Sequence, residues 1–365
     1  MKIVFITASI GYAGAAKQLC FVAESLAERG HEIHIVNLNS TQCAGAFERT
    51  VSEKVTVHVA KTSGRRGFRR FEQIGYIKKV AKQVGTELLV GYTPYPNAMA
   101  KIVGSMLHIP AIMSERGDPN CTFGKSAISR MMFSIINRCE GGVFQTQGAM
   151  DYYKEGMRKR GTVIANPIFV NEDPPYVAAT ERDKTVVSVG RLDNFQKRYD
   201  VMFDAFSIFS KIHPAYRLKL YGTGNDEAKF HAWCEERGIA DKVDFMGLTS
   251  QPMKDIAKDG MFLITSDFEG ISNSLLEAMA AGLPCVSTDH TPGGARLLIQ
   301  DGENGLLAPV ADAEKLAEAM CRFAEDEELT EKCGVAARDV TNRFAPNVIV
   351  DQWEQYCLKI VKGKK

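Results

Sequence analysis

The sequence predicts an α/β protein built from two doubly wound domains, each with a parallel sheet between layers of helices. Its 365 residues exceed the length at which one hydrophobic core usually keeps growing. Short β-branched apolar runs alternate with amphipathic helical patterns, which is typical of parallel sheets with helices on both faces. A junction rich in proline and acidic residues, at 166–183, divides the alternation into two series, so we expect two domains of the same type.

The first series begins with a strand at 3–7 and a helix at 15–29. Leu19 and Leu26 fall on one face of that helix, and Gly30 stands where a glycine commonly follows a helix end. The remaining strands expected in this domain are 33–38, 55–59, 88–91, 111–114, 142–146 and 162–165.

The second series repeats this alternation after the junction. Strands are expected at 185–190, 217–221, 243–245, 261–265 and 284–287, and helices at 199–213, 227–237, 274–281 and 313–325. These patterns place the domains at 1–167 and 168–344. Because ligands of open α/β sheets bind outside the carboxyl ends of the strands, a cleft between the two domains is the expected site.

Composition indicates a soluble globular protein without a bias toward nucleic acid, since 45% of residues are hydrophobic, 24% are charged and the net charge is +1. The nine cysteines include no Cys-x-x-Cys pair, which is typical of reduced thiols in a cytoplasmic protein. No apolar run has the length of a transmembrane helix. The run at 3–10 is shorter and more β-branched than a usual signal peptide.

A basic stretch at 65–82 runs from Arg65 to Lys82 and carries Phe68 and Phe71 among its charges. One interpretation is an ordinary solvated loop and helix face. The other is a patch for anionic lipid or for a phosphate-bearing acceptor. The residues alone leave both interpretations open.

Two glutamates flank a predicted helix start in the second domain. Ser272 is a good N-cap residue, so Glu269 would lie in the preceding loop and Glu277 just over one turn inside the helix. Free backbone N–H groups at such a start suit phosphate or sugar oxygens, and the two carboxylates could accept hydroxyl donors of a bound polyol. The alternative is an ordinary loop charge and an ordinary exposed helix residue.

Arg191 and Lys197 follow Gly190 at the end of the first strand of the second domain. Two cations at this edge could neutralise a diphosphate leaving group without a metal, and the sequence has no clear Asp-x-Asp pair or histidine cluster for a divalent ion. The alternative is a pair of ordinary surface cations.

Glycines follow predicted strands in both domains. Gly14 follows the first strand of the chain, and Gly222 with Gly224 follows a strand of the second domain. A glycine at such a turn lets a phosphate or sugar approach the backbone closely. The first turn lacks the full dinucleotide fingerprint, so nicotinamide chemistry is not favoured.

Three charged residues, Glu115, Arg116 and Asp118, leave a strand end in the first domain. They are candidates for the cleft edge, and the alternative is a local Arg–carboxylate pair that holds the loop. His290 stands alone in a turn, which is more typical of a structural residue.

In this order, the motifs resemble the retaining glycosyltransferases of family 4, which have the GT-B fold. The most specific part is Glu269 and Glu277 in Phe-Glu-Gly-Ile-Ser-Asn-Ser-Leu-Leu-Glu, supported by Gly190-Arg191-Leu192 with Lys197 and by the sequence Asn-Gly-Leu-Leu at 304–307. The resemblance implies two Rossmann-like domains that face each other across a deep cleft. It also implies a last helix, within 345–365, that packs back on the first domain.

The resemblance implies roles for these residues. Glu269 would bind the donor sugar hydroxyls and Glu277 the ribose, while Arg191 and Lys197 would hold the diphosphate. Gly14 would lie over the diphosphate from the first domain. The other implied donor contacts are Gly190, Gly222, Gly224, Leu248, Gly270, Ile271, Ser272, Asn273, Ser274 and Leu275.

The sequence departs from the family pattern in two places. Many members have a histidine where this chain has Ser-Glu-Arg-Gly-Asp-Pro, as in a subset that builds surface polysaccharides and lipid-linked oligosaccharides. Glu115 and Asp118 are therefore candidate catalytic residues and Arg116 a candidate donor contact, without one assigned role. The glutamate that often follows the Gly-Gly segment is replaced by Ala295-Arg296.

The expected activity is retaining transfer of a hexose or N-acetylhexosamine from a nucleotide diphosphate sugar to a glycan or lipid-linked acceptor of cell-surface polysaccharide or lipopolysaccharide biosynthesis. A UDP-sugar is favoured, with GDP open, and no metal, cofactor or nucleic acid is implied. We expect a cytoplasmic protein, with residues 65–82 as a peripheral contact to the inner face of an anionic membrane. The alternatives are a nucleotide-sugar epimerase on the same fold and an inactive subunit that binds the sugar nucleotide.

Overall fold

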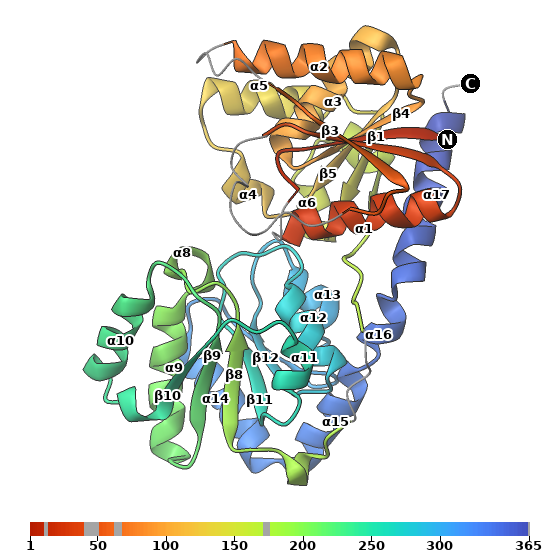
Figure 1. Ribbon diagram of the computed structural model, residues 1–365. Helices are drawn as coiled ribbons and strands as arrows, with labels where there is room; N and C mark the ends of the chain where they lie inside the picture. Colours follow the sequence, from red (N-terminus) through yellow and green to blue (C-terminus); the bar gives the residue numbers. More distant parts are fainter. Residues whose placement is uncertain (11–13, 40–50, 62–67, 171–175, 364–365) are drawn as a thin grey trace. The chain divides into compact units, whose positions relative to one another are not determined.

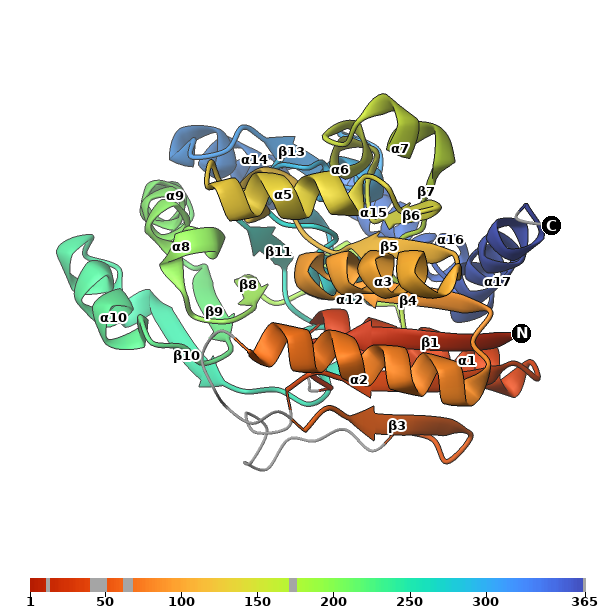
Figure 2. The same ribbon diagram turned by 90° about the horizontal axis from the view of Figure 1, so that it is seen from above.

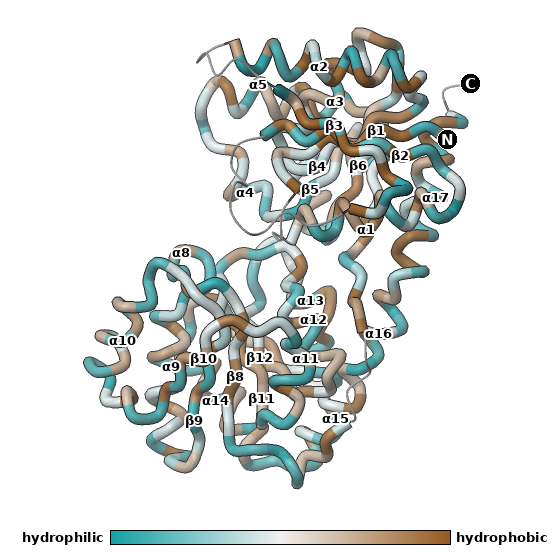
Figure 3. The backbone as a smooth tube through the Cα atoms, in the orientation of Figure 1, coloured by the Kyte–Doolittle hydropathy of each residue, from teal (hydrophilic) through white to brown (hydrophobic). Residues whose placement is uncertain are grey.

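The computed structural model describes residues 1–10, 14–39, 51–61, 68–170 and 176–363. The chain divides into two compact units (Figure 1). Unit 1 comprises Met1–Pro167 and Asn347–Lys365, and unit 2 comprises Ile168–Pro346. Hydrophobic residues follow the strands at the centre of each unit (Figure 3). Each unit therefore has its own sheet and its own core.

Unit 1 contains a seven-stranded parallel sheet with the strand order β3-β2-β1-β4-β5-β6-β7. In its centre, Ile3 of β1 is paired with Ile33 of β2 and with Leu88 of β4. These strands are nearly continuous apolar runs because helices bury both faces of the sheet. The strands are β1 (Lys2–Thr7), β2 (Glu32–Asn37), β3 (Val55–Val59), β4 (Leu88–Tyr92), β5 (Ala111–Glu115), β6 (Gly141–Phe144) and β7 (Gly161–Val163).

The helices of unit 1 cover this sheet. Helices α2, α3 and α5 lie side by side on one face (Figure 2). Trp353 of the last helix is buried and stacks on Tyr92 of β4, and Arg29 forms an ion pair with Asp351 at 2.6 Å. The helices are α1 (Gly14–Glu28), α2 (Arg69–Val84), α3 (Pro94–Leu107), α4 (Pro119–Thr122), α5 (Ala127–Ile136), α6 (Gln147–Asp151), α7 (Glu155–Arg160) and α17 (Pro346–Lys362).

Unit 2 contains a six-stranded parallel sheet with the order β10-β9-β8-β11-β12-β13. Strands β11 and β12 are completely buried, and the core extends to α9 and α14 on the same unit. The strands are β8 (Thr185–Val189), β9 (Arg217–Tyr221), β10 (Val243–Gly247), β11 (Met261–Ile264), β12 (Cys285–Thr288) and β13 (Leu306–Ala308).

Helices follow the strands of unit 2 in alternation. They are α8 (Asn194–Lys197), α9 (Tyr199–Ile212), α10 (Glu227–Glu236), α11 (Pro252–Asp255), α12 (Asn273–Ala280), α13 (Gly294–Leu298), α14 (Ala313–Glu325), α15 (Glu327–Ala337) and α16 (Val340–Arg343), with short 3-10 helices at Ala179–Glu181 and Ala240–Lys242. The prediction of two parallel α/β sheets is confirmed. In this unit the sequence patterns missed α15 and several shorter elements, which are too short to carry a period of their own: β13, α8, α11, α13 and α16.

The cysteines among the described residues are all free thiols, as the spacing predicts. Within the same ranges, we find no helix whose length and apolar character would let it cross a bilayer.

Candidate functional site

The loops after β8 and β11 define the candidate site of unit 2. In this sheet the strand order reverses between β8 and β11. These two strands are neighbours in the sheet, although β9 and β10 lie between them in the sequence. Ligands of doubly wound sheets bind at the carboxyl ends of the strands on either side of such a reversal. Gly190, Arg191 and Lys197 follow β8, and Glu269 follows β11.

Lys197 and Glu269 form an ion pair across this reversal point. The Lys197 Nζ atom lies 2.9 Å from each carboxylate oxygen of Glu269. The two side chains are 14% and 17% exposed, so the pair is largely removed from water while part of it stays accessible. The Glu269 carboxylate also accepts a hydrogen bond from the Ser266 hydroxyl at 3.2 Å. The backbone N–H of Glu269 donates to the Thr291 carbonyl at 2.8 Å.

Backbone and side-chain bonds hold the two loops together around this pair. The Asp267 N–H donates to the Gln196 carbonyl at 3.1 Å, and the Gln196 amide donates to the Phe268 carbonyl at 3.0 Å. Arg198, in a left-handed conformation between α8 and α9, forms an ion pair with Asp267 at 2.6 Å. The relative position of Lys197 and Glu269 is therefore fixed before any ligand binds.

The charge state of Glu269 follows from its surroundings. Burial alone would raise the pKa of its carboxyl, but the positive charge and hydrogen bonds of Lys197 outweigh burial, so the pKa lies below its ordinary value. Glu269 is therefore an anion at neutral pH. It can accept hydrogen bonds from the hydroxyls of a ligand, and Lys197 can donate to an anionic group.

His290 is buried beside the same loop. Burial lowers the pKa of its imidazole, which keeps the ring neutral near pH 7. Its Nε2 atom has no hydrogen-bond partner among the described residues, while its Nδ1 atom lies 3.4 Å from the Thr291 carbonyl oxygen.

Glycines let the strand-end loops of unit 2 pack backbone against backbone. A Cβ atom on Gly222 would lie 1.8 Å from the Gly190 carbonyl oxygen, and one on Gly294 would lie 1.7 Å from the Gly270 carbonyl oxygen. Gly224 approaches Leu192 in the same way, at 1.9 Å. No side chain fits at these distances, so the glycines position the loops that carry Gly190 and Gly270.

Helix α12 begins at the same edge, and its predicted start is confirmed. Ser272 is the N-cap residue, and its hydroxyl accepts from the Leu275 N–H at 3.4 Å. Glu277 lies on the second turn and is half-buried. Of the other predicted donor contacts around this start, Asn273 and Ser274 are half-buried, while Gly270, Ile271, Ser272 and Leu275 are buried.

Arg191 and Leu248 are more exposed. The Arg191 side chain is 65% exposed and lies 3.6 Å from the Asp193 carboxylate. Leu248 follows β10, at the carboxyl edge of the sheet, and is 75% exposed. The structure therefore brings Lys197, rather than Arg191, into contact with Glu269.

In unit 1, Glu115 ends β5 and is buried. One carboxylate oxygen accepts from the N–H groups of Arg116 and Gly117, at 3.0 and 3.3 Å, and the other accepts from the Tyr153 hydroxyl at 2.7 Å. Burial raises the pKa of Glu115 above its ordinary value, and these hydrogen bonds offset burial only in part. The carboxyl therefore acts as an internal acceptor that holds the following loop.

The other predicted residues of unit 1 also have defined surroundings. The Arg116 guanidinium lies over the rings of Tyr92 and Trp353, at 4.9 and 5.4 Å from their centroids. Asp118 is buried and caps α4, accepting from the Asn120 N–H at 2.8 Å. Within the described ranges Arg116 forms no ion pair with a carboxylate, so the alternative of a local Arg–carboxylate pair does not account for this loop. Gly14 is the first residue of α1, and residues 11–13 before it lie outside the described ranges.

In the described part of the chain, one group of side chains has the spacing of a metal site: His213, Cys321 and Glu325. Its ligand atoms lie within 4.8 Å of one another. His213 follows α9 and precedes β9, so this group belongs to the amino edge of the sheet, opposite the loops that carry Lys197 and Glu269.

Sequence reasoning assigned Lys197 to a clamp with Arg191 and did not foresee its contact with Glu269. It also missed the Arg198–Asp267 ion pair. One signal could have found both, because the two loops follow β8 and β11, which a doubly wound sheet places side by side at its reversal point.

Residues 170–340 match the family model described as "Glycosyl transferases group 1". The chain is 36% identical over 182 residues to an exopolysaccharide phosphotransferase of Streptomyces coelicolor, covering 50% of this chain and 19% of that protein. It is 22% identical to an uncharacterized glycosyltransferase of Haemophilus influenzae, covering 97% and 99% of the two chains. It is 35% identical to a lipopolysaccharide 1,6-galactosyltransferase of Salmonella typhimurium, covering 42% and 45%. The chain thus spans less than half of the first and third relatives and nearly all of the second.

Solved structures resemble the whole chain. HepE of Anabaena, in complex with UDP, has a TM-score of 0.83 at 18% identity, covering 98% of this chain and 100% of that chain. The apo form of the lipopolysaccharide outer core galactosyltransferase WaaB has a TM-score of 0.80 at 19% identity, covering 98% and 99%. These similarities confirm the predicted fold class, GT-B, with two Rossmann-like domains in one chain.

Proposed function

Since residues 170–340 match the family model of the group 1 glycosyl transferases, we propose that the chain is an enzyme of this family and transfers a hexose or N-acetylhexosamine from a UDP-sugar to a glycan or lipid-linked acceptor in cell-surface polysaccharide biosynthesis. The observation that carries the proposal is the Lys197–Glu269 ion pair at the reversal point of the unit 2 sheet. A preorganised anion and cation at this place suit a ligand that has both hydroxyl groups and phosphates.

In the proposed donor complex, Glu269 accepts hydrogen bonds from the donor sugar, and Lys197 donates to the diphosphate. Arg191, which is exposed, adds positive charge when the diphosphate is present. The positive end of the α12 dipole favours negative charge at the same edge. Glu277, on the second turn of α12, is proposed to bind the ribose.

Retention of configuration is proposed from the family resemblance. The bond between the anomeric carbon and the diphosphate oxygen breaks, and the acceptor oxygen attacks from the same face of the sugar. The acceptor proton passes to the departing phosphate oxygen. Lys197 and Arg191 stabilise the negative charge that develops on the leaving group, so no metal is required in this scheme.

The choice of donor and acceptor rests on the relatives. HepE was solved with UDP and with UDP-glucose. The Salmonella relative is named as a lipopolysaccharide galactosyltransferase. A UDP-sugar and an acceptor from surface polysaccharide assembly are therefore the chemistry to test first.

For unit 1, we propose that Glu115 and Asp118 position the loop through their internal hydrogen bonds and do not touch substrate. Phe68 and Phe71 are 65% and 73% exposed around Arg69 and Arg70 of α2, which supports a peripheral contact of this helix with anionic lipid at the cytoplasmic face. The preceding residues 65–67 lie outside the described ranges.

A thermal-shift screen against UDP, GDP, ADP and their common sugars tests the donor, because a ligand that binds only the folded state raises its apparent stability. We expect UDP and at least one UDP-sugar to raise the melting temperature. A response to GDP alone would replace the donor, and no response to any nucleotide would contradict the function.

Turnover then separates the alternatives. The donor that binds is incubated alone and with lipid-linked oligosaccharide acceptors, and UDP release is measured with and without EDTA. Conversion to an isomeric UDP-sugar would indicate an epimerase. Binding without release would indicate an inactive subunit, and loss of activity in EDTA that added metal restores would contradict the metal-free scheme.

A further inference from the structure

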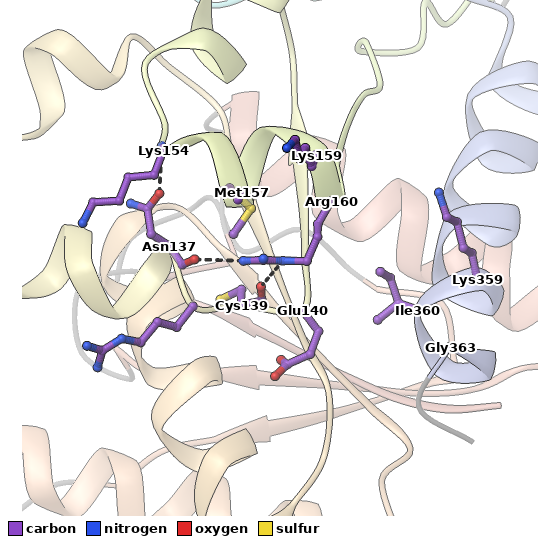
Figure 4. Close-up of a pocket in the computed structure, with 12 residues that line it drawn as sticks. Asn137, Cys139, Glu140, Lys154, Met157, Lys159, Arg160, Lys359, Ile360 and Gly363 are labelled. Carbon is purple, nitrogen blue, oxygen red and sulfur yellow. Dashed lines mark hydrogen bonds between the residues drawn. The ribbon is translucent and has the colours of Figure 1, made fainter.

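Unit 1 contains a hollow of about 900 Å³ that the proposed transfer reaction does not use (Figure 4). Three segments far apart in the sequence form it: the residues just before β6, helix α7, and the last turns of α17. Residues 137–140 directly precede β6, and Arg160 directly precedes β7, so the hollow lies at the amino edge of the sheet. Substrates of doubly wound sheets bind at the opposite edge.

Positive charge gathers in this hollow. Its lining includes five cationic side chains, Arg138, Lys154, Lys159, Arg160 and Lys359, but only one carboxylate. The whole chain has a net charge of +1, so this concentration is a local feature. Like charges that line one surface repel one another, so an anion bound among them would be stabilised.

The nearby carboxylates leave most of this charge uncompensated. Glu140 is the acid in the lining, and it is already bound to Lys101 at 2.6 Å and to the Ala111 N–H at 2.9 Å. Lys159 has a partner outside the lining, Glu155, at 2.6 Å. Among the described residues, Arg138, Lys154 and Lys359 form no ion pair. Lys159 and Arg160 lie in the last turn of α7, where positive charge interacts favourably with the helix dipole. This interaction does not account for the positive charges of Arg138, Lys154 and Lys359.

Part of the hollow is preorganised. The Arg160 guanidinium donates to the carbonyl oxygens of Asn137 and Cys139, at 3.0 and 3.3 Å, so its direction is fixed without neutralisation of its charge (Figure 4). Among the apolar residues of the lining, Met157 and Cys139 are completely buried, while Ile360 is partly exposed. Burial raises the pKa of Cys139 to about 12, so its thiol adds no negative charge.

We propose that this hollow binds a phosphate or phosphodiester group. The cations on its rim match the charge of the phosphate, and their N–H groups match its acceptor oxygens. The partly exposed Ile360 offers an apolar contact to the carbon skeleton attached to the phosphate. Two sources have this chemistry: the headgroup of an anionic phospholipid and a small soluble phosphate ester.

The test compares the full chain with a double variant, Arg138→Gln with Lys359→Gln. Both residues are exposed and lie outside the proposed donor site. The matched control, Lys211→Gln with Lys258→Gln, removes the same two charges from exposed positions of unit 2. One arm measures sedimentation with vesicles of phosphatidylglycerol or of phosphatidylcholine. The other arm titrates inorganic phosphate and glycerol 3-phosphate by calorimetry. Melting temperatures check that all proteins are folded.

We expect the double variant, Arg138→Gln with Lys359→Gln, to bind phosphatidylglycerol vesicles about fivefold more weakly for each cation removed. The control variant should bind like the wild type. Weakening in the vesicle arm alone would assign the site to a lipid headgroup. Weakening in both arms would assign it to the phosphate group itself, and weakening in the soluble arm alone would assign it to a small ester. The proposal would be overturned if the wild type and the double variant bound equally in both arms. It would also be overturned if the control variant lost as much binding as the double variant, or if the wild type did not bind.

Discussion

Glu269 in unit 2 and Glu115 in unit 1 both stand at the carboxyl edge of a parallel sheet, yet their surroundings differ. Glu269 contacts a cation, Lys197, and its pKa lies below the ordinary value. Glu115 accepts from two backbone N–H groups and the Tyr153 hydroxyl, and burial raises its pKa. A carboxylate at a strand end is therefore not by itself a sign of catalysis. Its partner decides whether it is an anion ready for a ligand or an internal acceptor.

The largest effect is expected from Lys197→Met. This change removes the cation beside Glu269, and we expect kcat/KM to fall about 10²- to 10³-fold, the usual cost of losing one preorganised electrostatic contact. The matched control is Lys219→Met, which breaks a second ion pair of the same sheet, with the buried Asp259 at 2.8 Å. The control should lose stability but retain its activity. Comparable loss of activity in both variants would mean that the Lys197 effect is structural.

Glu115→Ala should affect stability more than chemistry. It leaves the Tyr153 hydroxyl and two backbone N–H groups without their acceptor, which should cost about 3 kcal/mol in the free energy of unfolding. Glu115→Gln retains an acceptor and should be close to the wild type in urea unfolding and in transfer activity. A Glu115→Gln variant that is as stable as the wild type but inactive would place this carboxyl in the chemistry.

Gly294→Ala tests the close packing of the loops in unit 2. Its methyl group would collide with the Gly270 carbonyl oxygen, and we expect a cost of about 1–3 kcal/mol together with reduced activity. Gly117→Ala is the counterpart in unit 1, because a Cβ atom there meets nothing within 4 Å. Thermal unfolding and initial rates compare the two. Equal behaviour would show that the loop after Glu269 has freedom to adjust.

Glu269 and Glu115 should make opposite contributions to the pH dependence of the free energy of unfolding. The lowered pKa of Glu269 contributes stability that is present above about pH 4.3 and lost as the pH falls below it. The raised pKa of Glu115 means that stability is lost as the pH rises above about 4.3, because the buried carboxyl must then ionise. The advantage of wild type over Glu269→Gln should therefore shrink in acid, and its advantage over Glu115→Gln should shrink toward neutral pH. Urea unfolding at several pH values measures both, and parallel curves would refute the contrast.

Much of the fold could be predicted because hydrophobic periodicity is a local property. The strands at 55–59 and 217–221 and the helix at 313–325 have the predicted bounds, and the other expected elements differ by a few residues. Ser272 could be predicted as an N-cap because a cap depends on its own side chain and the next few residues.

The site was only partly predictable. Motifs located Lys197 and Glu269 separately, but their contact depends on the order of β8 and β11 in the sheet. The burial of Glu115 depends on Tyr153, which a different segment brings to it. The basic hollow joins α7 with α17, and no local pattern in the sequence indicates that these two helices meet. Contacts between distant segments therefore account for most of what sequence reasoning missed.

The central claim is that Glu269 recognises the sugar of the donor while Lys197 holds its diphosphate. Calorimetric titration of Glu269→Gln with UDP and with the UDP-sugar selected by the thermal-shift screen tests it most directly. We expect the variant to bind UDP like the wild type, but to lose the additional affinity that the sugar provides. A variant that keeps the wild-type difference between UDP-sugar and UDP would contradict the claim.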